Sequence, residues 1–102
     1  MENQHRHIKG YRELTTEEIE LMNKIKLAGA NLLTLQGQLV CLLTESTEAK
    51  CKAAHNPTST DVDSDEWSRF QGAEPFRWAA IGKTDIQTGI MALVRAVAQP
   101  AI

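Results

Sequence analysis

Apolar side chains recur along the first half of the chain at alternating spacings of four and three residues. This stripe comprises Leu21, Ile25, Ala28, Leu32, Leu35, Leu39 and Leu42. Such spacing keeps the side chains on one face of a helix and is typical of a coiled-coil seam. The start of the helix is marked by a capping box, in which Thr15 would cap the first turn and Glu18 would reach back. The pattern therefore predicts a long helix over residues 16–53.

The second half of the chain predicts a loop and then another long helix. Residues 55–64, HNPTSTDVDS, are turn formers and helix caps without periodicity, so we expect a loop there. A helix is predicted over 65–98, with a kink or break near Pro75, because proline lacks an amide donor and clashes with the preceding turn. Residues 1–14 would form an N-terminal segment with a brief helix or turn. The predicted fold class is all-α, a long antiparallel helical hairpin in a single domain.

The two predicted helices carry more apolar surface than they can bury against each other. Beside the leucine seam runs a second stripe, formed by Ile19, Met22, Lys26, Gly29, Leu33, Gln36, Val40 and Leu43. The last helix carries a stripe of alternating small and large residues, namely Ala79, Gly82, Ile86, Gly89, Leu93 and Ala96. A helix that is apolar on most of its circumference must be buried on more than one side. In a chain of 102 residues other copies would have to provide the cover, so we expect a homo-oligomer.

Composition and charge narrow the classes of partner. The net charge of −2 argues against a general DNA- or RNA-binding protein, which would normally carry a basic face. No uninterrupted apolar run reaches the roughly 18 residues that span a bilayer. The polar, basic N-terminus does not continue into the apolar core of a signal peptide. Cys41 and Cys51 read as small semi-buried hydrophobic residues. We therefore expect a soluble, cytoplasmic protein without a membrane partner.

A short cationic and aromatic patch stands out near the N-terminus. Residues 5–12, HRHIKGYR, hold three fixed positive charges, two histidines and the only tyrosine, with no acidic residue among them. The patch leads into a helix start, where phosphate binding is favoured. Tyr11 could pack on the helix start or offer a flat surface to a nucleobase. Lys26 interrupts the second stripe, and it could either extend outward at the edge of an interface or meet an anionic partner such as a phosphate.

Polar residues also follow one side of the last helix. Arg77, Thr84, Thr88 and Arg95 are spaced seven, four and seven residues apart. Such residues on an apolar face usually make interface hydrogen bonds or form a solvated edge. If several copies met around a symmetry axis there, the same donors could hold an anion.

The motifs that would indicate catalysis or metal binding are incomplete. Gly82-Lys83-Thr84 resembles the end of a phosphate-binding loop, but that motif requires glycine where Arg77 stands. His5 and His7 have no third ligand nearby in the sequence, and the acidic residues of 61–65 lack the downstream residues of a calcium loop. No nucleophile, base and orienting group occur together. We expect no catalytic residues, no metal and no cofactor.

The two ends of the chain resemble a known family. ENQHRHIKGYRELT at the start and EPFRWAAIGKTDIQTGIMALVRAVAQP at the end are similar to the signature blocks of the phage anti-CBASS sponges. Those small phage proteins sequester the cyclic oligonucleotides with which bacteria trigger suicide effectors. The two blocks cover about 40 of the 102 residues and agree in order and in spacing from the termini.

The resemblance implies a helical homohexamer without catalytic activity, acting in the cytoplasm of the host bacterium. Cyclic dinucleotides such as 3′,3′-cGAMP would bind between protomers, and the site residues it implies are Gly10, Tyr11, Arg12 and Lys26. Cyclic trinucleotides would bind at separate sites where three protomers meet, with Arg77, Thr84 and Thr88 as candidates. Family members often carry lysine where this chain has His7. A helical scaffold without a small-molecule ligand remains the alternative, because the leucine seam fits it equally well.

Overall fold

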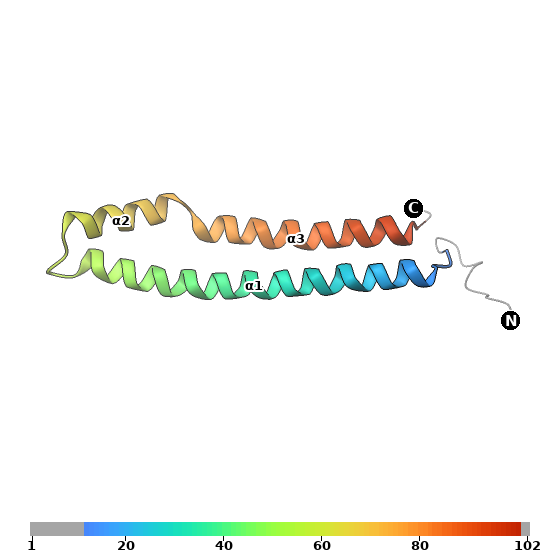
Figure 1. Ribbon diagram of the computed structural model, residues 1–102. Helices are drawn as coiled ribbons and strands as arrows, with labels where there is room; N and C mark the ends of the chain where they lie inside the picture. The colour runs from blue at the N-terminus through green and yellow to red at the C-terminus, as the bar shows by residue number, and fades with distance from the viewer. Residues whose placement is uncertain (1–11, 101–102) are drawn as a thin grey trace. The chain divides into compact units, whose positions relative to one another are not determined.

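The computed structural model describes residues 12–100 and contains three helices in this range (Figure 1). These are α1 (Thr16–His55), α2 (Asp61–Gly72) and α3 (Pro75–Ala98). No strand occurs among the described residues. The prediction of an all-α protein is therefore confirmed, whereas the brief helix or turn expected before Gly10 falls outside the described residues.

The first turn of α1 is closed by the capping box that the sequence indicates. The backbone N–H of Glu18 donates to Thr15 Oγ1 at 3.1 Å, and the backbone N–H of Thr15 donates to Glu18 Oε1 at 2.9 Å. Each side chain thus accepts a hydrogen bond from the backbone N–H of the other residue. Without a cap, backbone N–H groups at the start of a helix have no partner within the helix. This reciprocal pair fixes the point at which α1 begins.

A second capping box makes the loop after α1 shorter than expected. The side chain of Thr60 accepts from the backbone of Asp63, and the Asp63 carboxylate accepts from the backbone N–H of Thr60 at 3.1 Å. Helix α2 therefore begins at Asp61, four residues before the predicted position. Only residues 56–60 lie between α1 and α2. The sequence contains this cap as T-x-x-D within the stretch predicted to be a loop.

The second half of the chain forms two helices and not one kinked helix. Helix α2 ends at Gly72, and Pro75 is the first residue of α3, where a missing amide leaves no helical hydrogen bond unmade. Glu74 between them has φ 49°, a left-handed conformation that stops the helix. Gln99, the other described non-glycine residue with positive φ, also precedes a proline, Pro100.

The described residues form two compact units. One unit combines the part of α1 up to Leu33 with the chain from Asp85 onward, and the other runs from Thr34 to Thr84. In the second unit Phe70 and Ala79 are buried, and the Gln36 side-chain amide donates to the carbonyl of Ala79 at 3.0 Å. This hydrogen bond links the middle of α1 to the first part of α3.

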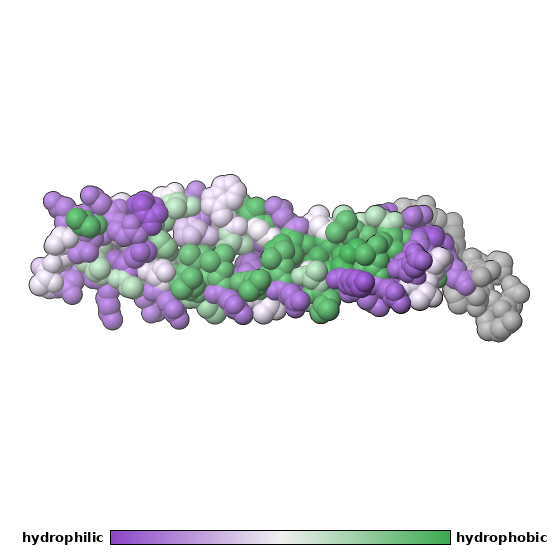
Figure 2. Space-filling model, viewed as in Figure 1, coloured by the Kyte–Doolittle hydropathy of each residue, from purple (hydrophilic) through white to green (hydrophobic). Residues whose placement is uncertain are grey.

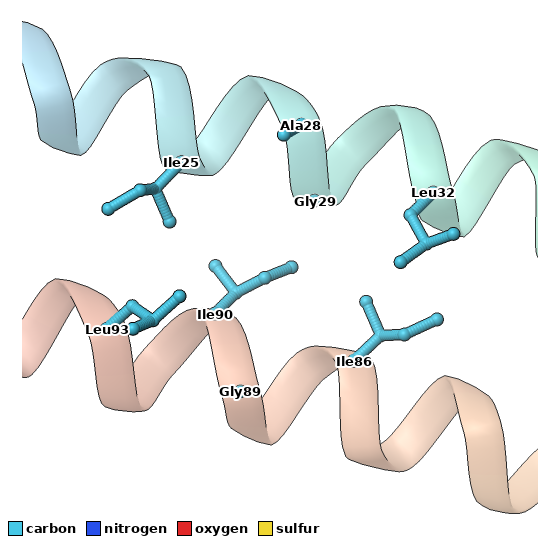
Figure 3. A pocket seen from close by; sticks show the side chains of 8 residues that line it. All are labelled: Ile25, Ala28, Gly29, Leu32, Ile86, Gly89, Ile90 and Leu93. Atoms are coloured by element: carbon cyan, nitrogen blue, oxygen red, sulfur yellow. The ribbon is translucent and has the colours of Figure 1, made fainter.

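In the first unit, α1 and α3 lie side by side in opposite directions (Figure 3). Ile25 and Leu32 from α1 point toward Ile86 and Ile90 from α3. Gly29, which belongs to the second stripe, is the buried residue of α1, and Ile25 and Leu32 of the leucine seam lie at the edge of the same contact. A helix presents this side because glycine lets the neighbouring helix approach closely.

The leucine seam is not buried within the chain. Its leucines are 45–58% exposed; these are Leu21, Leu32, Leu35, Leu39 and Leu42. Large apolar side chains of α3 are exposed as well, among them Trp78, Met91 and Leu93. Figure 2 shows hydrophobic residues gathered on the visible face of the molecule. The leucines with the clearest coiled-coil spacing are thus largely exposed to solvent in the single chain.

The hydropathy of α1 bears on the expectation that no apolar run spans a bilayer. By length and composition alone α1 could cross a membrane, because an 18-residue window reaches a mean hydropathy of 1.3. The stretch between Lys26 and Glu45 contains no charged residue, although Asn31 and Gln36 interrupt its apolar run. Core helices of soluble proteins meet the same criterion. Only 6% of the window is buried within the described residues.

Candidate functional site

The groove between α1 and α3 in the first unit is apolar. It has a volume of about 320 Å³ and is lined by Ile25, Ala28, Gly29, Leu32, Ile86, Gly89, Ile90 and Leu93. No lining side chain carries a hydrogen-bonding group, so the groove offers nothing to fix an anion. Its lining is typical of a helix-packing surface.

Lys26 lies on α1 beside this packing surface. It is exposed, and it precedes Gly29 by three residues, which places the two residues on neighbouring positions of the helix surface. Among the described residues Lys26 makes neither a hydrogen bond nor an ion pair. Its ammonium group is thus available to an anion that approaches this end of α1.

The other predicted dinucleotide residues are consecutive, and the structure describes one of them. Gly10 and Tyr11 lie outside the described residues, so the pairing of Tyr11 with Lys26 stays a prediction. Arg12 is the first described residue, and its guanidinium is already engaged. Its Nη2 forms an ion pair with the Glu18 carboxylate and donates to the carbonyl of Val97 at 2.7 Å. The sequence did not indicate this contact with α3.

The charge of Glu18 is stabilised by the same contacts. The pKa of Glu18 lies below its ordinary value, first because the backbone N–H of Thr15 donates to the carboxylate and next because Arg12 does. Glu18 is also in the first turn of α1, where the helix dipole favours a negative charge. The carboxylate is therefore ionised at neutral pH and holds Arg12 at the start of the helix.

The three residues predicted for a trinucleotide site are all exposed. Arg77 and Thr84 belong to the second unit, whereas Thr88 belongs to the first. The Arg77 guanidinium lies over the ring of Trp78, 5.0 Å from its centroid, in a cation–π arrangement. Arg77 also borders a cavity of about 280 Å³, whose other walls include the aromatic rings of Trp67, Phe70 and Phe76.

A cluster of charged and aromatic residues ties α1 to α2 in the second unit. Glu66 accepts two hydrogen bonds from Arg69 at 2.7 Å and forms an ion pair with Lys50 at 2.8 Å. Lys50 lies 5.7 Å from the centroid of the Phe70 ring, on which Trp67 stacks. These contacts lower the pKa of Glu66 to about 2, with the Arg69 hydrogen bonds as the largest cause. The partners come from two helices, so helix periodicity could not predict the cluster.

Within residues 12–100 no three His, Cys, Asp or Glu side chains are placed to hold a metal ion. His5 and His7 lie outside this range. Cys51 and His55 approach each other one helical turn apart, with Sγ 3.7 Å from Nδ1, and His55 Nδ1 is 2.7 Å from the Cys51 carbonyl oxygen. The His55 ring also meets Trp67 of α2 edge to face, with the ring centroids 6.2 Å apart.

Comparison with known proteins relates this chain to a family and to a curated relative. The Acb2/Tad1 hairpin domain matches residues 3–98 of this chain. The protein named Anti-CBASS protein 2 of Pseudomonas phage JBD67 is 54% identical over 108 aligned residues, which cover 98% of this chain and 97% of that protein. Both matches extend through all three helices and through the N-terminal residues that carry the predicted dinucleotide site. This chain belongs to the Acb2/Tad1 hairpin-domain family.

Proposed function

We propose that this chain is an anti-CBASS protein of phage origin that sequesters cyclic oligonucleotides without degrading them. The observation that carries the proposal is the 54% identity to Anti-CBASS protein 2 over nearly the full length of both chains. Capture of the messenger inside the host bacterium would keep it from its effectors, so the protein would act in the host cytoplasm.

The first ligand class is a cyclic dinucleotide such as 3′,3′-cGAMP, bound near Gly10, Tyr11, Arg12 and Lys26. Such a ligand is a flat ring with two phosphates and two bases. Lys26 is exposed and makes no ion pair within the described residues, so its ammonium group would meet a phosphate. A charge-assisted hydrogen bond of this kind is stronger than a neutral one. Tyr11 would supply an aromatic surface for a base.

The second ligand class is a cyclic trinucleotide, bound near Arg77, Thr84 and Thr88. Arg77 combines a positive charge with an adjacent aromatic ring, Trp78, which is 59% exposed. Phosphate and base are the two chemical groups that such a pair would recognise.

Both sites would depend on assembly of several copies, and the family analogy indicates a hexamer. The exposed leucine seam supports a homo-oligomer, because contiguous apolar surface on a protein is normally covered by a partner. Gathering several copies would also bring residues of neighbouring protomers to one ligand. A pocket between protomers can enclose a small cyclic ligand and exclude water from it.

The proposal is tested by titrating the purified protein with 3′,3′-cGAMP in a calorimeter and by measuring the assembly mass with native mass spectrometry. Lys26→Ala should weaken dinucleotide binding while the assembly mass stays unchanged. Lys24→Ala is the matched control, because it removes a neighbouring exposed charge from the same helix. Ligand released by denaturing the complex should be intact. Linear product would instead indicate an enzyme, and the absence of binding to any cyclic di- or trinucleotide would refute the proposal.

The exposed seam also favours a second candidate, a helical scaffold whose function is the oligomer itself. In that case the assembly would form, no cyclic nucleotide would bind, and a specific protein partner would be recovered with the oligomer. Titration and assembly mass together therefore separate the two functions.

A further inference from the structure

We infer that the cavity between α1, α2 and the turn that joins α2 to α3 is a subsite for a single guanine base of a cyclic trinucleotide, with the Glu74 carboxylate as the group that recognises the base. This subsite rests on the proposed function for the class of ligand. It adds to that function a preference for one base and the residue that sets the preference.

The cavity is shaped by aromatic side chains of the second unit. It has a volume of about 280 Å³, and its walls include the rings of Trp67, Phe70 and Phe76. Trp67 and Phe70 stack with their centroids 6.3 Å apart, and Phe70 is buried, so packing fixes this wall. Pockets for drug-sized ligands begin at about 300 Å³. The cavity therefore suits one planar base of a cyclic trinucleotide and not the whole ligand.

Two groups of opposite charge border the cavity. Glu74 and Arg77 are three residues apart, and both are exposed. No ion pair joins them within the described residues, where Arg77 instead lies over the ring of Trp78. The hydrogen bonds of Glu74 in this range are made by its backbone, with Gln71 and Trp78. The carboxylate is thus available to a donor on a ligand, and the guanidinium is available to a phosphate.

The backbone at residue 74 does not explain why a glutamate stands there. Its φ of 49° is a left-handed conformation, which glycine adopts more easily than any residue with a side chain. Gln99 has a similar φ and also precedes a proline, so this backbone alone does not mark a site. Glu74 differs because it borders a cavity with aromatic walls. Strained residues cluster at binding sites, where the side chain has a role that glycine cannot take.

The chemistry of a carboxylate selects the base. An ionised carboxylate only accepts hydrogen bonds. The Watson–Crick edge of guanine presents two adjacent donors, N1–H and the 2-amino group, which match the two oxygens of Glu74. No other common base has two adjacent donors on this edge. In adenine the lone pair of N1 would face the carboxylate and be repelled. Glu74 therefore favours guanine, and Arg77 would hold a phosphate of the same ligand.

The test compares two cyclic trinucleotides by calorimetry, one with a guanine and two adenines and one with three adenines. The unmodified protein should bind the guanine-containing ligand more tightly. Glu74→Gln should weaken that binding roughly tenfold, as expected for the loss of a bidentate contact to a base. The all-adenine ligand should bind this variant at least as tightly as the unmodified protein, because a repulsion is removed.

Asp65→Asn is the matched control for this change. It removes an exposed carboxylate of α2 that does not border the cavity, so it should alter neither affinity. Glu74→Gly separates recognition from folding. It should unfold at no lower urea concentration than the unmodified protein, because glycine suits the left-handed backbone, and it should still lose the preference for guanine. All variants should bind 3′,3′-cGAMP equally, since its proposed site does not include Glu74.

Equal affinity of the unmodified protein for the two trinucleotides, or a preference for the all-adenine ligand, would overturn the guanine subsite. An unchanged preference in Glu74→Gln would overturn it as well, and so would binding of 3′,3′-cGAMP without binding of either trinucleotide. Failure of the unmodified protein to bind any cyclic nucleotide would instead overturn the proposed function, so the two failures are distinguishable.

Discussion

Gly29 of α1 lies directly against the side chain of Ile90 of α3. A Cβ atom built on Gly29 would be 2.1 Å from Ile90 Cδ1 and 2.5 Å from Cγ1, far inside the van der Waals distance. The two helices of the first unit approach each other as closely as they do because residue 29 has no side chain. In Figure 3, Ile90 points into the space beside Gly29.

Gly29→Ala should therefore destabilise the protein, because Ile90 would have to move away from α1. Overpacking of this kind costs about 1–3 kcal/mol, and the better helix propensity of alanine offsets up to about 1 kcal/mol of it. Gly37→Ala is the matched control, since a Cβ there meets nothing within 4 Å. It should stabilise α1 by about 0.5–1 kcal/mol. Urea unfolding of both variants measures the difference, and equal stabilisation by both would contradict the close contact.

Leu39→Glu should reduce the assembly mass, because Leu39 belongs to the exposed seam that other copies are proposed to cover. Burying a leucine contributes about 1.5–3 kcal/mol, and a charge at the same position adds a desolvation penalty. Gln38→Glu introduces the same charge at the neighbouring exposed position of α1 and should leave the mass unchanged. Native mass spectrometry reads out both variants. An unchanged mass for Leu39→Glu would show that the seam is not an interface between copies.

Acid should weaken the second unit through Glu66. Its pKa is lowered from the ordinary value of 4.5 to about 2 by the hydrogen bonds from Arg69 and Lys50. A lowered pKa means that the ionised carboxylate stabilises the fold fully above pH 4.5 and loses this effect as the pH falls from 4.5 toward 2. Glu66→Gln should lower the free energy of unfolding at pH 7 and flatten its decline below pH 4.5.

The control for this titration is Asp65→Asn, which removes a carboxylate from the same helix without touching Lys50 or Arg69. Urea unfolding measured at several pH values compares the two variants with the unmodified protein. A decline below pH 4.5 as steep in Glu66→Gln as in the unmodified protein would show that other carboxylates dominate the acid response.

Arg77→Ala should weaken the binding of a cyclic trinucleotide by at least roughly tenfold, because it removes a charge-assisted contact and unstacks the cation from Trp78. Binding of 3′,3′-cGAMP should be unaffected, since its proposed site lies in the other unit. Lys83→Ala removes a different exposed charge from α3 and should leave both ligands bound. Calorimetric titration with each ligand separates these outcomes. Equal loss of both ligands in Arg77→Ala would indicate a structural role for the arginine.

Local signals explain which parts of the fold could be predicted. The Thr15 and Glu18 pair and the apolar spacing were enough for the start of α1, because caps and periodicity act within one or two helical turns. The start of α2 has an equally local cause in Thr60 and Asp63, so that boundary was predictable and the prediction was wrong. Pro75 indicated an interruption, but its place as the first residue of α3 depends on the left-handed backbone at Glu74.

Part of the candidate site could be predicted from the sequence, and part could not. The spacing drew attention to Lys26 but left its role open, and the resemblance to the family implied that it binds the ligand; the structure shows Lys26 exposed. The engagement of Arg12 with Val97 could not be predicted, because the two residues are brought together only when the ends of α1 and α3 pack in the first unit. The cluster of Lys50, Glu66 and Arg69 could not be predicted either, because its residues come from two helices.

The sequence by itself determined that the chain is helical, where its apolar stripes run, and to which family it belongs. It could not decide which stripe of α1 the chain buries for itself, because both stripes have the same period. The tertiary structure decided this in favour of the stripe with Gly29, since only there can α3 approach closely enough for Ile90 to pack against the backbone. The leucines of the seam were left largely exposed as a result.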